Sequence, residues 1–166
     1  MIKDKKDRIS TSLKFIIFIV IFSFTLGMLF SLRVDINEFT IVENQNFISK
    51  FLNIFMMNFW IIFIMWIFGK YRSLFIVNFF IVFVKCFLLG TIFMINIKCN
   101  NFLSYFKYFI VDFFVYLPLL IFVLYENVKY NFDEENIKIN YDLLIIIYAI
   151  WCLIYASICS IIGSNL

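Results

Sequence analysis

The residues that could do chemistry in this chain are few, and histidine is not among them. The sequence has 166 residues, with 14 Lys and Arg, 11 Asp and Glu, 4 Cys and no His. Without imidazole, a serine–histidine triad, a histidine general base and a histidine-ligated zinc site are excluded. The cluster Asp133-Glu134-Glu135 lacks the spacing of an EF-hand loop, and no C-x-x-C pair occurs. We therefore expect no enzyme activity, no metal and no cofactor.

Lys85 and Asp112 are the charged residues of most interest, because both fall inside long apolar runs. Lys85 lies eleven residues after Leu74, which is about 16 Å along a helix. Asp112 lies seven residues after Tyr105, about 10 Å along the next run, and is the only acidic residue within the predicted spans. Charge at such a depth in a membrane is costly and usually has a reason.

Several interpretations of this pair stay open. The lysine stem can extend toward Asp112 and form a structural charge pair. Lys85 can instead face a water-filled gap, line a contact with another protein, or belong to a proton or ion path. We favour structure or contact over transport, because one pair without further acidic or histidine relay residues makes a poor path.

The composition requires a membrane around these residues. The chain is 64% hydrophobic and 22% aromatic, with 25 Phe, and only 15% of it is charged. A soluble chain of this length cannot bury so much apolar surface in its own core, and about 25% charge is usual for soluble domains. The net charge of +3 is too small to indicate nucleic-acid binding. We interpret most Phe residues as lipid-facing bulk.

Five apolar segments are long enough to cross a bilayer, which takes about 20 residues. We therefore predict an all-α, polytopic membrane helix bundle that forms one domain over residues 1–166. The first segment is longer than a signal-peptide core and has no cleavage site after it, so we expect it to stay as an anchor. Residues 47–55 are either a short interfacial helix or the start of the second span. The predicted spans are 13–32, 51–69, 74–97, 105–125 and 143–162.

The basic residues of the short loops predict the orientation of the bundle. With five spans, nine basic residues fall on the side of the N-terminus and four fall on the other side. This asymmetry places the N-terminus in the cytoplasm. The nine are Lys3, Lys5, Lys6, Arg8, Lys14, Lys70, Arg72, Lys129 and Lys138, and the four are Arg33, Lys50, Lys98 and Lys107.

Small residues recur in three of the spans at spacings that let helices approach closely. They pack the bundle internally, or they form a docking face for another membrane protein. The residues are Ser23, Gly27 and Ser31 in the first span, Cys86 and Gly90 in the third, and Ala149, Cys152, Ala156, Cys159 and Gly163 in the fifth.

Pro118 and three asparagines are the remaining features within the spans. Pro118 is expected to kink the fourth span and to free the carbonyl of Phe114. We expect Asn58, Asn78 and Asn96 to form interhelical hydrogen bonds worth about 1 kcal/mol each.

The order of these features resembles the stage II sporulation protein M family. The likeness begins in the run from Phe24 to Ser31, which carries Gly27, and continues in Trp66-Ile67-Phe68-Gly69. Lys85-Cys86-Phe87-Leu88-Leu89-Gly90 is similar to the family's basic residue followed by Gly-Phe-Ile-Leu-Gly, and Leu117-Pro118 resembles its proline-bearing fourth span. Cys86 stands where the family has glycine.

The resemblance implies a non-catalytic scaffold in the bacterial inner membrane. Family members act with the stage II sporulation proteins D and P, which cut peptidoglycan, when the mother-cell membrane engulfs the forespore. The implied partners are therefore other membrane proteins and the lipid bilayer, with no nucleic acid and no soluble substrate. The alternative is a small transporter subunit, such as the substrate-binding component of an energy-coupled vitamin importer, which typically has six spans and a polar cavity.

Overall fold

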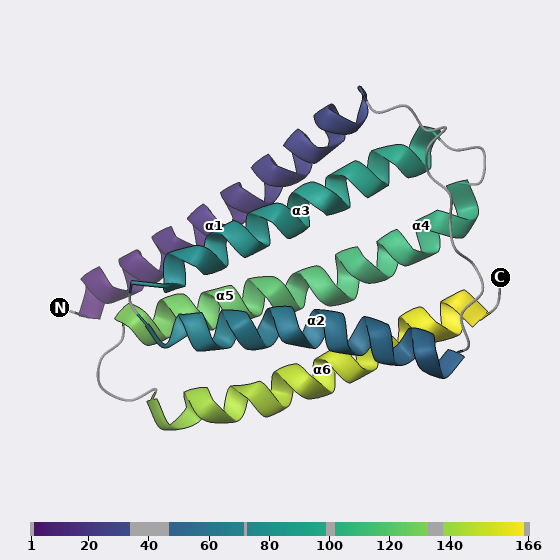
Figure 1. The fold of residues 1–166 in the computed structure, drawn as a ribbon. Helices are drawn as coiled ribbons and strands as arrows, with labels where there is room; N and C mark the ends of the chain where they lie inside the picture. Colours follow the sequence, from purple (N-terminus) through teal and green to yellow (C-terminus); the bar gives the residue numbers. More distant parts are fainter. Residues whose placement is uncertain (1, 34–46, 72, 99–101, 133–137, 165–166) are drawn as a thin grey trace.

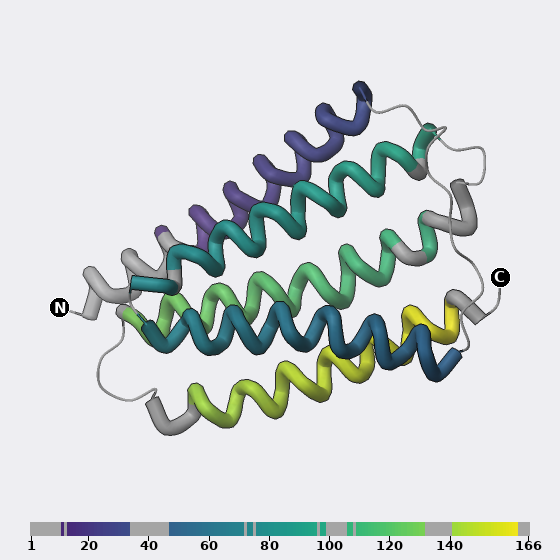
Figure 2. The backbone as a smooth tube through the Cα atoms, viewed as in Figure 1, coloured from purple at the N-terminus to yellow at the C-terminus, as the bar shows by residue number. Residues whose placement is uncertain are grey.

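The computed structural model describes residues 2–33, 47–71, 73–98, 102–132 and 138–164, and every regular element in these ranges is helical (Figures 1 and 2). The prediction of an all-α fold is therefore confirmed. The helices are α1 (Ile2–Ser31), α2 (Phe47–Gly69), α3 (Phe75–Lys98), α4 (Phe102–Val111), the π-helical segment η2 (Asp112–Tyr116), α5 (Leu117–Phe132) and α6 (Lys138–Ser164).

The described helices include five segments long and apolar enough to cross a membrane, as predicted. The fourth is made jointly by α4, η2 and α5, and it continues past the predicted end at residue 125. Helix α2 runs without a break from Phe47, so residues 47–55 are the start of the second span rather than a separate interfacial helix. The five segments are Leu13–Ser31, Phe47–Gly69, Ile76–Ile95, Phe109–Asn131 and Tyr141–Ile162.

The helices pack around the rod formed by α4, η2 and α5. Helix α1 lies along α3, and the two run in the same direction, while α2 lies against α6 (Figure 1). Helix α5 contacts α1, α2, α3 and α6. The N-terminus and the C-terminus lie at opposite ends of the bundle. We call the end that contains the α2–α3 turn the hairpin end.

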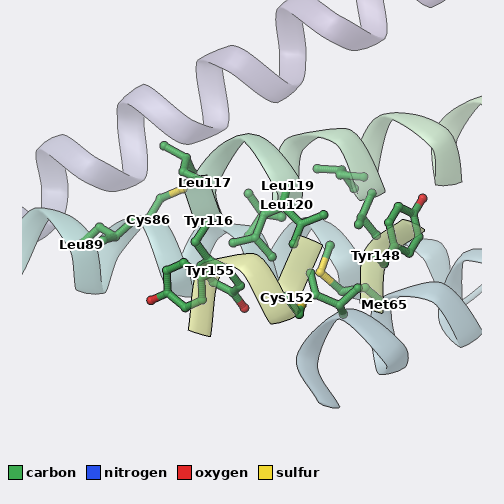
Figure 3. Close-up of a cluster of buried hydrophobic side chains, with 14 of the residues drawn as sticks. Met65, Cys86, Leu89, Tyr116, Leu117, Leu119, Leu120, Tyr148, Cys152 and Tyr155 are labelled. Atoms are coloured by element: carbon green, nitrogen blue, oxygen red, sulfur yellow. The ribbon is translucent and has the colours of Figure 1, made fainter. Parts of the chain in front are cut away.

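The centre of the bundle is formed by α5. Its residues Leu119, Leu120, Val123 and Leu124 are completely buried, and they pack near Met65 of α2 and Tyr148 of α6 (Figure 3). Outward-facing side chains are also apolar and large, as Phe114 shows with an exposed fraction of 68%. Lipid is as apolar as these side chains, so close packing and hydrogen bonds must hold the helices together.

Helices α1 and α3 approach each other closely at Gly27 and Gly90. A Cβ atom on Gly27 would meet the carbonyl oxygen of Phe87, and one on Gly90 would meet that of Phe24. Thr91 Oγ1 lies 3.2 Å from the Gly27 carbonyl oxygen and donates across this contact. The glycines therefore let the two backbones touch, which is how small residues stabilise helix pairs in lipid.

The C-terminal end of α1 is closed by a residue of α3. Lys98 Nζ donates to the carbonyl oxygens of Ser31 at 2.7 Å and Leu32 at 3.0 Å. The last carbonyls of a helix have no partner within the helix, and a cation is favoured beside them. This contact fixes the α1–α3 pair at the end opposite the hairpin.

Candidate functional site

Lys85 lies near the middle of α3. It is ten residues from the start of that helix at Phe75 and thirteen from its end at Lys98, so it lies about 15 Å and 20 Å from the two ends. The hydrocarbon layer of a bilayer is about 30 Å thick, so the backbone of Lys85 is near its centre. The side chain is half-buried, and Nζ lies 5.5 Å from the centroid of the Tyr116 ring.

Asp112 begins the π-helical segment of the fourth span. In this segment the amide of Leu117 donates to the carbonyl oxygen of Asp112, which widens the turn. The wide turn directly precedes Pro118, which has no amide hydrogen and whose ring would clash in a regular α-helix. The predicted distortion at Pro118 is thus a single π turn, a feature that is frequent at functional sites.

A carbonyl near Pro118 finds a side-chain partner on another helix. The carbonyl oxygen of Val115 accepts a hydrogen bond from Trp151 Nε1 of α6, at 3.1 Å, while the freeing of the Phe114 carbonyl by Pro118 stays a prediction. The widened turn displaces carbonyls from the regular ladder, so a donor on the neighbouring helix can reach them.

Two tyrosines complete the surroundings of Asp112. The hydroxyl of Tyr155 on α6 donates to Asp112 Oδ1. The Tyr155 ring lies 5.0 Å from that of Tyr116, and both side chains are buried (Figure 3). The Tyr116 hydroxyl is fully enclosed and has no hydrogen-bond partner in the structure. We call Lys85, Asp112, Tyr116 and Tyr155 the Lys85 cluster.

The structure brings Lys85 and Asp112 within electrostatic range of each other. They do not form a direct ion pair, since within the described ranges the ion pairs closer than 4.0 Å are Lys70–Asp142 and Lys129–Glu126. Asp112 accepts a hydrogen bond from Tyr155, whereas the amine of Lys85 lies over the ring of Tyr116. The cluster therefore leaves an ammonium group at mid-membrane depth without a contacting carboxylate.

A second group of polar side chains surrounds the last two turns of α2. Our sequence reasoning singled out Asn78 in this group and missed Asn127, Asn131 and Tyr141. Asn78 and Asn127 both donate to the carbonyl oxygen of Met65, at 2.9 and 3.0 Å. Tyr141 contacts the carbonyl oxygen of Trp66 at 3.0 Å and also hydrogen-bonds Asn127 Oδ1. We call the group of Asn78, Asn127, Asn131, Tyr141 and Trp66 the α2-end cluster.

The α2-end cluster joins four helices through neutral hydrogen bonds. Asn131 donates to the Gly69 carbonyl oxygen at 2.7 Å, and Trp66 Nε1 donates to the Tyr141 carbonyl oxygen at 3.2 Å. Of the last four carbonyls of α2, that of Trp66 is thus capped by α6 and that of Gly69 by α5, while Asn78 of α3 and Asn127 of α5 bind the carbonyl of Met65 just before them. Among the described atoms of this cluster, Asn78 Oδ1 is buried without a partner. The arrangement is suited to hold helices together.

A charged contact lies beside this cluster at the hairpin end. Lys70 Nζ is 2.7 Å from an oxygen of Asp142 and 3.9 Å from the centroid of the Trp66 ring. The Trp66 and Tyr141 rings stack with an angle of 7° between their planes. A signal for this site existed in the sequence, because Trp66 and Gly69 belong to one of the short motifs quoted above.

The small residues singled out in the sequence lie mostly inside the bundle. Ser23, Gly27 and Ser31 are buried on α1, and Gly90 is buried on α3. On α6, Ala156 is buried and Ala149 is half-buried, while the burial of Gly163 is not among the features that the structure describes. The buried positions among them pack within the chain.

The asparagine and cysteine predictions have mixed outcomes. Asn78 donates across to α2, as described, but the hydrogen bond of Asn58 runs to Ile54 of its own helix at 2.8 Å. Three buried cysteines carry free thiols, at positions 86, 152 and 159. The side chain of Asn96, Cys99 and the acidic cluster at 133–135 lie outside the described residues.

The described residues contain no group of three or more His, Cys, Asp or Glu side chains placed to hold a metal ion. Their two polar clusters can donate hydrogen bonds and hold charge within a membrane. The fold and these clusters define a polytopic helical membrane protein with five spans. No protein family matches this chain, and neither a curated protein nor a solved structure does.

Proposed function

We propose that the protein is a non-catalytic scaffold of the bacterial inner membrane that holds other membrane proteins together at the cell envelope. The observation that carries this proposal is the half-buried ammonium of Lys85 at mid-membrane depth, with no described carboxylate within 4.0 Å. Such a charge is costly in lipid unless something uses it. A contact with another membrane protein uses it without any chemistry.

The form of the molecule supports a scaffold in two further ways. Most of the described residues belong to the membrane-spanning segments, so the binding surface that this part of the chain offers lies mainly within the bilayer. The α1–α3 contact and the α2-end cluster stiffen the bundle from both ends. A stiff bundle presents its outer faces in fixed positions, which suits recruitment.

The resemblance to the stage II sporulation protein M family suggests what is recruited. By that resemblance, the partners are peptidoglycan-cutting proteins such as the stage II sporulation proteins D and P, and the setting is engulfment in a spore former. The distribution of Lys and Arg in the sequence supports a cytoplasmic N-terminus. The hairpin end would then face the cytoplasm.

The test is recovery of partners with the tagged protein from detergent-solubilised host membranes. We expect peptidoglycan hydrolases to be recovered with the unaltered protein and to be depleted with Lys85→Leu. The matched control is Val84→Leu, which changes a lipid-facing neighbour and keeps the charge. Failure to recover any envelope protein from membranes that contain them would contradict the scaffold.

One observation favours the alternative of a transporter subunit. The Lys85 cluster places a carboxylate, an ammonium and two phenols at one depth, as a polar ligand site within a membrane would. In that case the same experiment would recover ATP-binding-cassette subunits and a coupling membrane protein in place of hydrolases.

A further inference from the structure

Helix α4 covers the part of the bundle between the Lys85 cluster and the end opposite the hairpin. It has ten residues, which is about 15 Å, and it leads directly into η2 at Asp112. Lys85 lies about 20 Å from that end of α3, so α4 runs beside the stretch of α3 that follows Lys85 (Figure 1). Helix α4 packs against α3 and α6, whereas α5 is enclosed by four helices. The fourth span is therefore anchored by its α5 half.

The two halves of the fourth span meet at a π turn whose hydrogen bonds are incomplete. The amide of Leu117 reaches back to the carbonyl oxygen of Asp112, and Pro118 follows with no amide hydrogen to continue the ladder. Helices bend where prolines and π turns interrupt the regular hydrogen bonds. The segment η2 is thus the place where α4 can tilt relative to α5.

On the side of α3, aromatic rings hold α4 in place. The ring centroid of Phe109 lies 4.7 Å from that of Phe93 on α3 and 6.3 Å from that of Phe24 on α1. The Phe109 side chain is buried. Rings that separate in a membrane exchange one apolar contact for another, and no polar group loses a partner. This side of α4 can therefore open at little cost.

On the side of α6, hydrogen bonds hold the π turn. The Tyr155 hydroxyl donates to Asp112 Oδ1, and Trp151 Nε1 donates to the carbonyl oxygen of Val115. The two donors are four residues apart, so they lie on the same side of α6. Breaking either bond would leave polar groups without partners in an apolar setting, which is costly. The contact between Tyr155 and Asp112 lies at the α4 end of the turn and opposes the tilt of α4.

We propose that α4 is a gate that closes the Lys85 cluster from the end opposite the hairpin, with η2 as its hinge and the contact between Tyr155 and Asp112 as its latch. In the closed state, Phe93 and Phe109 lie between the cluster and that end. When the latch opens, α4 tilts about η2, and water and small hydrophilic solutes reach Asp112 and Lys85. This inference does not rest on the proposed scaffold function.

Two buried thiols of α6 can report the opening. Cys159 lies four residues after Tyr155, toward the end opposite the hairpin, and Cys152 lies three residues before it. The full-length protein in lipid nanodiscs is treated with a small charged thiol reagent, and peptide masses identify the modified cysteine. Tyr155→Phe removes the hydroxyl and keeps the ring. We expect Cys159 to react about tenfold faster in this variant and Cys152 to react at an unchanged rate, because α5 stays in place.

Two variants of Asp112 test the latch from its other side. Asp112→Ala removes the acceptor and should accelerate the reaction of Cys159 as Tyr155→Phe does. Asp112→Asn keeps an oxygen that accepts from the Tyr155 hydroxyl, so Cys159 should react as slowly as in the unaltered protein. If Tyr155→Phe is not monodisperse, the comparison of these two variants decides the matter.

The matched control is Tyr148→Phe, which removes a buried hydroxyl of α6 that has no hydrogen-bond partner in the structure. Both thiols should react in this variant as in the unaltered protein. The gate is refuted if Cys159 reacts at the same rate in Tyr155→Phe as in Tyr148→Phe. It is also refuted if Cys152 and Cys159 accelerate together, since that result would mean a general loosening of the bundle.

Discussion

The two polar clusters of the bundle differ in the kind of group that they leave unpaired: in the α2-end cluster it is the neutral amide oxygen of Asn78, whereas the Lys85 cluster also leaves the lysine amine without a contacting carboxylate. In the α2-end cluster, the carbonyl oxygens of Met65, Trp66 and Gly69 each receive a donor from another helix. In the Lys85 cluster, Tyr155 satisfies Asp112, whereas Tyr116 keeps an enclosed hydroxyl without a partner. Lys85 has no contacting carboxylate in the described residues.

This difference separates polar groups that stabilise the fold from polar groups that lack a partner within the described chain. Neutral side chains that donate to backbone carbonyls stabilise the folded chain. An unpaired carbonyl in lipid costs several kcal/mol, about the scale of a whole hydrogen bond. A charge that is incompletely paired does not stabilise the fold in this way. Stability should therefore depend strongly on the α2-end cluster and weakly on the Lys85 cluster.

The largest loss of stability is expected from Gly69→Ala. The added Cβ atom would meet the side chains of Asn127 and Tyr141, and neither can move without breaking its hydrogen bonds. Overpacking of this kind costs about 3 kcal/mol. Denaturation in mixed micelles measures it, with Ser73→Ala in the exposed part of the same turn as the control. A stability equal to that of the unaltered protein would show that the cluster is loosely packed.

A smaller loss is expected from Asn127→Leu. This change removes one donor to the Met65 carbonyl and the acceptor used by Tyr141, while Asn78 still donates to Met65. Because one donor remains, the loss should be about 1.5 kcal/mol in the same denaturation experiment. Asn53→Leu, at an exposed position of α2, is the control. Equal losses of stability in the two variants would show that the α2-end cluster does not stabilise the bundle more than an exposed position does.

Lys70→Met should lower stability by about 1 kcal/mol, because it removes both the contact with the Trp66 ring and the ion pair with Asp142. The ion-pair part should shrink in high salt, since Asp142 is largely exposed. Denaturation at low and high ionic strength checks both statements. Lys129→Met, whose pair with Glu126 spans 3.9 Å, should show the weaker effect of the two.

The smallest effect is expected from the double variant Lys85→Met/Asp112→Asn. Both charges are removed together, and a carboxamide at position 112 can still accept from the Tyr155 hydroxyl. The stability should stay within about 0.5 kcal/mol of the unaltered protein, since removing two opposite charges together leaves no uncompensated charge in the bundle. A loss as large as that of Gly69→Ala would make the Lys85 cluster structural and abolish the contrast.

The sequence was sufficient to predict the spans, because about 20 apolar residues in succession have few other uses. It was also sufficient to single out Lys85 and Asp112, since charge inside such a run is rare. Both predictions rest on local composition. They do not depend on which helix lies beside which, and the structure agrees with the positions of the spans.

The α2-end cluster was not predictable in the same way. Asn127, Asn131 and Tyr141 lie near the ends of predicted spans, where polar residues usually face the membrane surface. Their inward role depends on α6 packing against α2, a contact between residues 75 positions apart. The same holds for the hydrogen bond of Trp151 to the Val115 carbonyl, which forms because α6 places Trp151 beside the π turn.

The tie between Trp66 and Tyr141 has a consequence for biosynthesis. Tyr141, which caps the end of α2, is translated 75 positions after Trp66, which takes about 4 to 15 seconds at about 5 to 20 residues per second. During that interval the end of α2 must stay at the membrane surface, where water can cap it. Synthesis of α6 would then supply the Tyr141 hydroxyl, so α2 gains this cap only after α6 has been made. A chain that stops before residue 141 should be recognised by membrane proteases as unfinished.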